Sequence, residues 1–156
     1  MAAEKNPRNR DIAVNRRARH EYHIEETCEA GIVLQGSEVK ALREGKANLK
    51  DSYGRFEGEE VFLWNAHISP YGPASQFGHE PTRTRKLLLH REEINRLLGK
   101  VERAGYTLIP LNLHYKGGWI KLEIGLAKGK KQYDKRQDIK DKDWQRQQQR
   151  LMRQKA

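Results

Sequence analysis

Apolar and polar residues alternate through much of the middle of this chain. The apolar residues of 120–127 alternate with polar or small ones, and so do those of 109–115. A period of two predicts half-buried strands. Because Gly117 and Gly118 lie between the two runs, the pattern indicates a hairpin. Pro110 cannot donate a ladder hydrogen bond, so its strand is expected at a sheet edge or with a bulge.

Other segments add further strands. A second hairpin is predicted from 53–56 and 61–68, with its turn at 57–59. Segments 86–90 and 21–25 are expected to supply more strands. Many short antiparallel strands favour a mainly β fold, and we predict a small closed antiparallel barrel of the oligonucleotide-binding type.

Two or three helices are expected to flank the barrel. Apolar residues of 94–101 fall at positions i, i+3, i+4 and i+7, which gives one apolar helix face. Gly105 follows where a C-terminal cap belongs. A shorter helix is predicted over 29–34, with an extension into 39–43.

The chain is predicted to contain one folded domain between two basic ends. Residues 1–14 hold few large apolar groups and are expected to form a flexible arm. The barrel domain is placed at 15–127, with a long exposed loop at 69–81. Residues 128–156 are predicted to be disordered when free and helical when bound to a partner. The alternative is a solvated tail without a partner.

The distribution of charge indicates the class of partner. The net charge is +10, but residues 21–127 contribute −1, whereas residues 1–20 contribute +4 and residues 128–156 contribute +7. Basic ends on a nearly neutral body suit a phosphate backbone, because neutralised phosphates release condensed counterions. Nucleic acid is therefore favoured over charge that serves solubility alone.

The sequence offers little for catalysis. One cysteine, Cys28, allows no intramolecular disulfide, and the six histidines show no metal-ligand spacing. No phosphate-binding loop motif is present. We therefore expect no enzyme activity, metal or cofactor. No apolar run approaches the roughly 20 residues that cross a bilayer, so a cytoplasmic protein is predicted.

Four stretches carry the basic and aromatic groups that RNA recognition uses. They are Asn15–Tyr22, Gln35–Arg43, Thr82–Leu89 and Lys128–Arg136. Aromatic rings suited to stacking on bases are His20, Tyr22, Tyr53 and Trp119. These residues alone indicate an RNA-binding barrel with a basic tail.

In this order, Asn15–Tyr22, Gly31–Arg43, Arg85–Leu89 and Ala127–Arg136 resemble the SsrA-binding protein family. The resemblance implies that the barrel binds the tRNA-like domain of transfer-messenger RNA and delivers it to stalled ribosomes. It also implies that the tail of the RNA-binding barrel domain, residues 128–156, is helical on the ribosome and occupies the decoding centre and empty mRNA channel of the small subunit. The expected partners include an alanyl-tRNA-like complex with elongation factor Tu, and the protein is expected to be a monomer.

The candidate residues fall into two groups. The expected RNA-binding residues are Arg17, Arg19, His20, Tyr22, Glu29, Lys40, Arg43, Tyr53, Arg85, Lys86, Leu88 and Lys121. The residues expected at the decoding region are Lys128, Lys130, Lys131, Tyr133, Asp134, Lys135, Arg136 and Trp144. The resemblance ties Glu29, Leu88 and Lys121 to RNA binding, and 134–136 to accommodation in the decoding region.

Several alternatives remain at this point. Glu29 could instead cap a helix beginning at Ala30, and Leu88 could face the core. Lys121 points opposite to Ile120 and Leu122, so it is expected to face outward. The chain could also be a general ribosome-associated factor of the same fold, or an RNA-modifying enzyme with a clustered acid, histidine or cysteine in a concave site.

Overall fold

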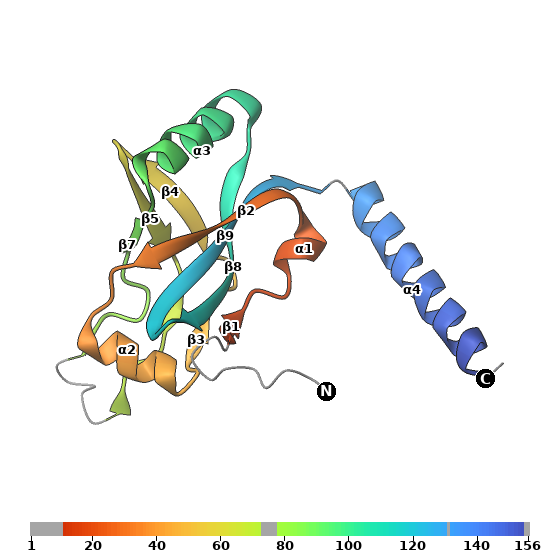
Figure 1. Ribbon diagram of the computed structural model, residues 1–156, viewed down its shortest axis with the longest axis horizontal. Coiled ribbons are helices and arrows are strands. Elements are labelled where there is room, and N and C mark those ends of the chain that lie inside the picture. The colour runs from red at the N-terminus through yellow and green to blue at the C-terminus, as the bar shows by residue number, and fades with distance from the viewer. Residues whose placement is uncertain (1–10, 73–77, 131, 155–156) are drawn as a thin grey trace.

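The computed structural model describes residues 11–72, 78–130 and 132–154 (Figure 1). The strands are β1 Asp11–Val14, β2 Tyr22–Ile32, β3 Ala47–Asn48, β4 Tyr53–Glu57, β5 Glu60–Trp64, β6 His67–Ile68, β7 Arg85–Leu88, β8 Thr107–Lys116 and β9 Trp119–Gly129. The helices are α1 Ala18–Glu21, α2 Gly36–Arg43, α3 Arg91–Ala104 and α4 Gln132–Gln154.

Antiparallel pairing closes the main sheet into a ring. The strand order is β1-β8-β4-β5-β7-β2-β9, and the further pairing of β8 with β9 closes the ring, with β1 as an additional strand beside β8. The β4–β8 join is narrow, because its register consists of one pair, Gly54 opposite Leu108. A Cβ atom on Gly54 would lie 2.8 Å from the Leu108 Cβ, so only glycine permits this approach. The predicted mainly β fold with closed antiparallel strands is confirmed.

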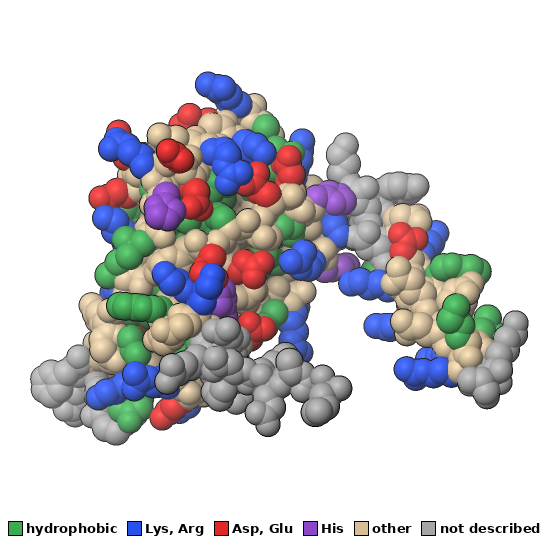
Figure 2. All heavy atoms as spheres, viewed as in Figure 1, with side chains coloured by type: hydrophobic (Ala, Val, Ile, Leu, Met, Phe, Trp, Pro, Cys, Tyr) green, Lys and Arg blue, Asp and Glu red, His purple; other side chains and the backbone are tan. Residues whose placement is uncertain are grey.

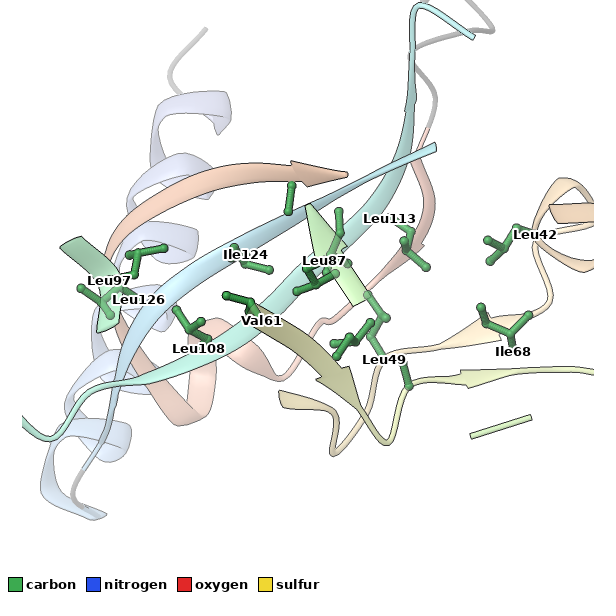
Figure 3. Close-up of a cluster of buried hydrophobic side chains, with 14 of the residues drawn as sticks. Leu42, Leu49, Val61, Ile68, Leu87, Leu97, Leu108, Leu113, Ile124 and Leu126 are labelled. Atoms are coloured by element: carbon green, nitrogen blue, oxygen red, sulfur yellow. The ribbon is translucent and has the colours of Figure 1, made fainter. Parts of the chain in front are cut away.

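The core lies inside the ring and contains mostly leucine, isoleucine and valine (Figure 3). The period-two pattern of β9 places Leu122, Ile124 and Leu126 there, each almost fully buried. Leu97 of α3 packs into the same cluster. Figure 1 shows α3 near one end of the ring and α2 near the other.

The predicted β8–β9 hairpin is confirmed, and so is the special role of Pro110. The β8–β9 register shifts between Pro110 and Asn112, which marks a bulge. The β4–β5 hairpin also forms, although the predicted second strand divides into β5 and the short β6. Helix α3 ends as expected, because Gly105 has a φ of 71° and supplies a left-handed C-terminal cap.

The helix predicted over 29–34 is wrong. Strand β2 continues to Ile32, and Ala30 lies fully buried opposite Leu122 of β9. Pairing and burial in the ring therefore decide the conformation of this segment. Helix α2 begins only at Gly36, where the Glu38 side chain accepts a hydrogen bond from the Gln35 backbone N–H at 2.7 Å.

The predicted flexible arm and the predicted exposed loop also need correction. The last four residues of the expected arm form β1, because they pair with residues 112–114 of β8. Residues 1–10 lie outside the described residues. The expected exposed loop at 69–81 is attached at His79, which is buried. The His79 Nε2 lies 2.8 Å from the Ile68 carbonyl oxygen, and its Nδ1 lies 2.9 Å from the Ser37 Oγ.

The basic tail is helical as α4 and projects away from the ring (Figure 1). Figure 2 shows Lys and Arg side chains along one side of this helix and apolar side chains along the other. The apolar groups Trp144, Leu151 and Met152 are exposed. Disorder of the tail in free solution stays a prediction. No helix in the described part of the chain is long and apolar enough to span a membrane.

Candidate nucleic-acid interface

Three predicted residues from three distant parts of the sequence meet on the outside of the ring. Gly31 of β2 pairs with Lys121 of β9 and also with Leu88 of β7. Lys121 and Leu88 therefore lie on either side of Gly31, and Glu29 is two residues back along β2. Together with His90 and neighbouring residues they line a cavity of about 430 Å³. This cavity is called the Lys121 site below.

The side chain of Leu88 faces solvent, since 52% of its surface is exposed. The alternative that Leu88 packs in the core is therefore wrong, and its neighbour Leu87 fills that role. Lys121 is half-buried, as expected for a long side chain lying along the outer face. An exposed leucine beside an ammonium group suits a nucleotide, which offers an apolar base and an anionic phosphate.

Glu29 does not cap a helix, because it lies within β2. Its carboxylate accepts from His114 Nε2 at 2.9 Å and pairs with Lys116 Nζ at 3.2 Å. Burial alone would raise the pKa of Glu29, but the hydrogen bonds from His114 and Lys116 outweigh it and hold the pKa below its ordinary value. Glu29 is therefore an anion at neutral pH and can accept hydrogen bonds only.

A second group of predicted residues meets near α1. Arg17, Tyr22 and Tyr53 line a cavity of about 300 Å³ together with Lys50. Asn15 fixes the chain entering this cavity, because its side-chain amide donates to the Pro110 carbonyl oxygen at 2.9 Å. The arrangement places two phenol rings beside a guanidinium group, which is the combination used for stacking and phosphate binding. Arg19 is exposed on the neighbouring helix surface, and His20 is half-buried.

Helix α2 carries two further predicted cations on its exposed surface. Lys40 lies over the ring of Tyr71, with 5.5 Å between Nζ and the ring centroid. Arg43 lines an apolar cavity of about 280 Å³ with Tyr115 and Trp119. Trp119 is 74% exposed, so its indole ring is free to stack on a base. Lys86 on β7 is also accessible, although it forms an ion pair with Glu60 at 3.1 Å.

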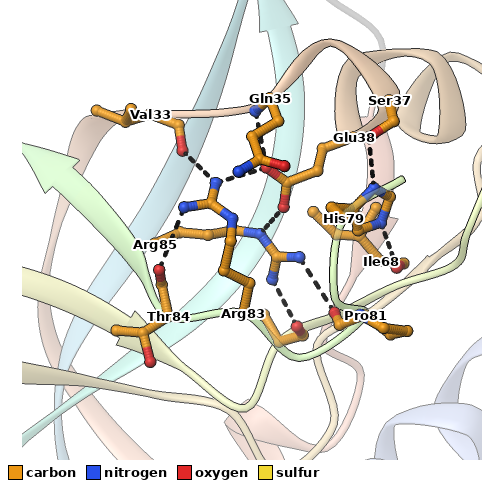
Figure 4. Close-up of polar contacts among 11 residues, drawn as sticks. Val33, Gln35, Ser37, Glu38, Ile68, His79, Pro81, Arg83, Thr84 and Arg85 are labelled. Carbon is orange, nitrogen blue, oxygen red and sulfur yellow. Dashed lines mark hydrogen bonds and ion pairs between the residues drawn. The ribbon is translucent and has the colours of Figure 1, made fainter. Parts of the chain in front are cut away.

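Arg85 is the prediction that the structure overturns. Its side chain is fully buried and pairs with the equally buried Glu38 of α2 (Figure 4). It also donates to the carbonyl oxygens of Ala66, at 2.7 Å, and Pro81, at 3.1 Å. All the polar groups of the Arg85 side chain therefore bind partners inside the protein, and this side chain cannot contact RNA. Arg83 joins the same carboxylate from the surface.

The residues leading into α4 attach the tail to α1. The Lys130 backbone N–H donates to the Glu21 carbonyl oxygen at 2.8 Å, and its Nζ donates to the Arg19 carbonyl oxygen at 2.9 Å. The Lys128 Nζ lies 5.7 Å from the ring centroid of Tyr106. Arg136 and Trp144 are exposed on α4.

The remaining tail predictions are only partly covered by the structure. Lys131 lies outside the described residues. For Tyr133, Asp134 and Lys135 the structure describes the helical backbone and not the side chains.

The sequence-based prediction missed the residues that hold Glu29. Asn112, His114 and Lys116 recur at every second position of β8 and therefore share its outer face. These polar residues alternate with the apolar residues of β8, and this alternation was the sequence signal that could have identified them. What the pattern could not reveal is that β8 and β2 lie on either side of β9, so that His114 reaches across to Glu29.

Comparison with known proteins decides the family. The model of the SmpB protein family matches residues 12–154, almost the whole chain. The chain belongs to the SmpB family. SmpB relatives called SsrA-binding protein include one from Azoarcus sp., 62% identical over 146 residues, which cover 93% of this chain and 99% of the relative. Another, from Geobacillus thermodenitrificans, is 58% identical over 142 residues, which cover 91% and 92%.

A solved SmpB structure gives the same result in three dimensions. The chain matches a structure described as "tmRNA-SmpB: a journey to the center of the bacterial ribosome". The TM-score is 0.65 and the sequence identity 52%, and the match covers 76% of this chain and 84% of the other. Family membership and fold are thus supported independently by sequence and by structure.

Proposed function

We propose that the protein binds the tRNA-like domain of transfer-messenger RNA and delivers it to stalled ribosomes for trans-translation. The observation that carries this proposal is the Lys121 site, where an exposed leucine, a carboxylate and an ammonium group from three strands meet on one face. The similarity to SsrA-binding proteins and to a transfer-messenger RNA complex on the ribosome supports the same partner.

The proposed RNA surface extends beyond this site. Arg17, Tyr22 and Tyr53 form a second cavity, while Lys40 and Arg43 add charge on α2. Several separate cationic sites suit a folded RNA, which presents phosphates and unstacked bases at different points on its surface. In this proposal Arg85 acts only by holding β7 against α2, which keeps Leu88 in place.

The tail has a separate part in the proposal. Helix α4 carries cations along one side and exposed apolar groups along the other, and its main contact among the described residues is with α1. The cations of such a helix suit a channel with walls of ribosomal RNA. We place it in the empty mRNA channel of the small subunit, with residues 133–136 near the decoding centre. The protein itself catalyses no reaction in this proposal and works in the cytoplasm beside the ribosome.

Purified protein and a transcript of the tRNA-like domain test the proposal directly. Filter binding or fluorescence anisotropy should give a dissociation constant at least about tenfold lower than that for an unrelated hairpin RNA of equal length. Capture of the tagged protein from bacterial extract, with sequencing of the bound RNA, should recover transfer-messenger RNA. Equal affinity for both transcripts would instead favour a general ribosome-associated factor.

A further inference from the structure

A chain of hydrogen bonds runs across the outer face of β8, β9 and β2, beside the Lys121 site. The His114 Nε2 lies 2.9 Å from a Glu29 carboxylate oxygen, and the His114 Nδ1 lies 2.6 Å from the Asn112 side-chain oxygen. The Asn112 side-chain nitrogen donates in turn to the Glu123 carboxylate at 2.9 Å. Both ring nitrogens of one histidine are thus engaged.

The chemistry of the partners determines where the protons lie. A carboxylate only accepts, so Asn112 must direct its NH₂ group at Glu123 and its oxygen at the imidazole ring. The amide oxygen also only accepts, and His114 must therefore donate from Nδ1. A neutral imidazole has one N–H, which would leave a lone pair on Nε2 facing the Glu29 carboxylate. Both contacts are favourable together only if His114 carries two protons or Glu29 carries one.

Glu29 is not the group that carries the extra proton. Its pKa lies below the ordinary value, because hydrogen bonds from His114 and Lys116 outweigh the effect of burial. Lys116 Nζ lies 3.2 Å from the second carboxylate oxygen, Oε1, and stabilises the same anion. The geometry of the pair therefore corresponds to an imidazolium donating to a carboxylate, which is a charge-assisted hydrogen bond.

This pair affects the neighbouring ammonium group. Lys121 lies opposite His114 in the β8–β9 register and lines the same cavity as Glu29. His114 engages one oxygen of the Glu29 carboxylate and Lys116 engages the other. Within the described residues Lys121 forms no ion pair, so its ammonium group remains available for a phosphate.

We propose that His114 is a positioning residue of the RNA site, which in its imidazolium form holds Glu29 toward β8 and keeps Lys121 available for RNA phosphate. The inference rests on the proposed function for its ligand. When the ring loses a proton, it has one N–H for the two acceptors, so the hydrogen bond to the carboxylate loses its charge assistance and Glu29 is held less firmly. Glu29 then turns toward Lys121, neutralises it, and RNA affinity falls as the pH rises.

Charged groups surround His114 on four strands. Asp11 of β1 is paired directly with His114, and Glu29 faces it from β2. Lys116 lies on the same strand, and β9 contributes Lys121 and Glu123. These three anions and two cations are the charged groups that surround the His114 ring.

Binding of the tRNA-like domain should therefore depend on pH in part through His114. Between about pH 6 and pH 8, where histidines titrate, the wild-type dissociation constant should rise about threefold to tenfold. His114→Gln should make this rise smaller, because a glutamine amide donates to Glu29 without titrating. His67→Gln, at the exposed position of β6, is the matched control and should keep the wild-type pH dependence. A His114→Gln protein with the wild-type pH dependence overturns the proposal.

Two further measurements separate this inference from the proposed function. In the free protein at about pH 6, ¹⁵N NMR of the histidine rings should show both His114 nitrogens protonated, and one unprotonated nitrogen there contradicts the inference without any RNA. With RNA, the losses caused by His114→Ala and Lys121→Ala should not add, because both act on the same phosphate contact. Additive losses would mean that His114 acts elsewhere. Failure of every variant and of the wild type to prefer the tRNA-like domain would instead refute the proposed function.

Discussion

Gly31 of β2 and Leu88 of β7 pair so closely that a Cβ atom on residue 31 would lie 3.1 Å from the Leu88 Cβ. The absence of a side chain at Gly31 lets Leu88 lie along the outer face beside Lys121, with half its surface exposed. A large apolar group held in solvent contributes little to folding and is available to a ligand.

Leu88→Ala should therefore weaken binding of the tRNA-like domain while leaving the melting temperature almost unchanged. Leu87→Ala on the same strand is the matched control, because Leu87 is buried in the core. The control should lose about 2–5 kcal/mol of unfolding free energy by leaving a cavity. Thermal melts and fluorescence anisotropy distinguish the two, and a large loss of stability in Leu88→Ala would contradict the placement of this side chain.

Lys121→Ala should weaken the same interaction through charge. One lost phosphate contact should flatten the slope of log affinity against log salt by about one, with no drop in melting temperature. Lys50→Ala, at the separate cavity near Tyr53, offers a comparison of equal charge change. An unchanged salt slope for Lys121→Ala would show that its ammonium group does not contact a phosphate.

The buried ion pair between Glu38 and Arg85 should make folding sensitive to acid. Burial would raise the pKa of Glu38, but hydrogen bonds from Arg83, the Gln35 backbone and Arg85 outweigh it and lower the pKa. A carboxyl whose pKa is lower in the folded state stabilises the fold above its unfolded pKa of about 4.3, and this contribution disappears as the pH falls further.

Urea unfolding between pH 7 and pH 3 should show this loss for the wild type. Glu38→Gln should be less stable at pH 7, by about 3–5 kcal/mol, because it leaves the Arg85 charge buried without a partner. Its stability should also vary less with pH. Equal pH dependence in both proteins would exclude Glu38 as a source of acid sensitivity.

The tail should separate RNA binding from ribosome function. A protein truncated after Lys131, or one with alanine at Asp134, Lys135 and Arg136, should keep its affinity for the tRNA-like domain within about threefold, because the RNA cavities lie on the ring. Both should lose peptide tagging in a reconstituted translation system stalled without a codon in the A site. Normal tagging by the truncated protein would refute the role given to α4.

The thiol of Cys28 should be nearly inert. Burial and then the nearby charge of Glu93 raise its pKa to about 11. At about pH 8 a thiol of this kind holds roughly a hundredfold less thiolate than one with the ordinary value of 9.0. Alkylation by iodoacetamide, followed by mass spectrometry, should be correspondingly slow in the native protein and fast in urea. Rapid native labelling would mean that β2 opens readily.

Sequence pattern predicted those parts of the fold in which local signals and tertiary contacts agree. The β8–β9 hairpin combines strict alternation with a Gly-Gly turn, and α3 combines one apolar face with Gly105 as its cap. The helix predicted over 29–34 failed because Gly31, Ile32 and Val33 are poor helix formers, and the conformation of the segment is decided by pairing with β9. No local pattern contains that pairing.

The site was predictable in part for the same reason. Lys121 was placed on the outer face by the period of two alone, and the structure confirms this orientation. Arg85 was misplaced because alternation along a short strand does not tell which arginine enters the interior. That outcome depends on Glu38, which is 47 residues away and buried on α2.

The single residue pair that closes the ring between β4 and β8 also affects how the molecule moves. Nine residue pairs join β8 to β9, but only Gly54 and Leu108 join β8 to β4. Amide protons along this seam should exchange with solvent earlier than those of β9, since few hydrogen bonds must break. The cavity of Tyr53, Thr107 and Ile109 spans the seam. An RNA bound there would contact both strands and slow the opening of the ring between β4 and β8. The RNA and the protein would then each restrict the motion of the other.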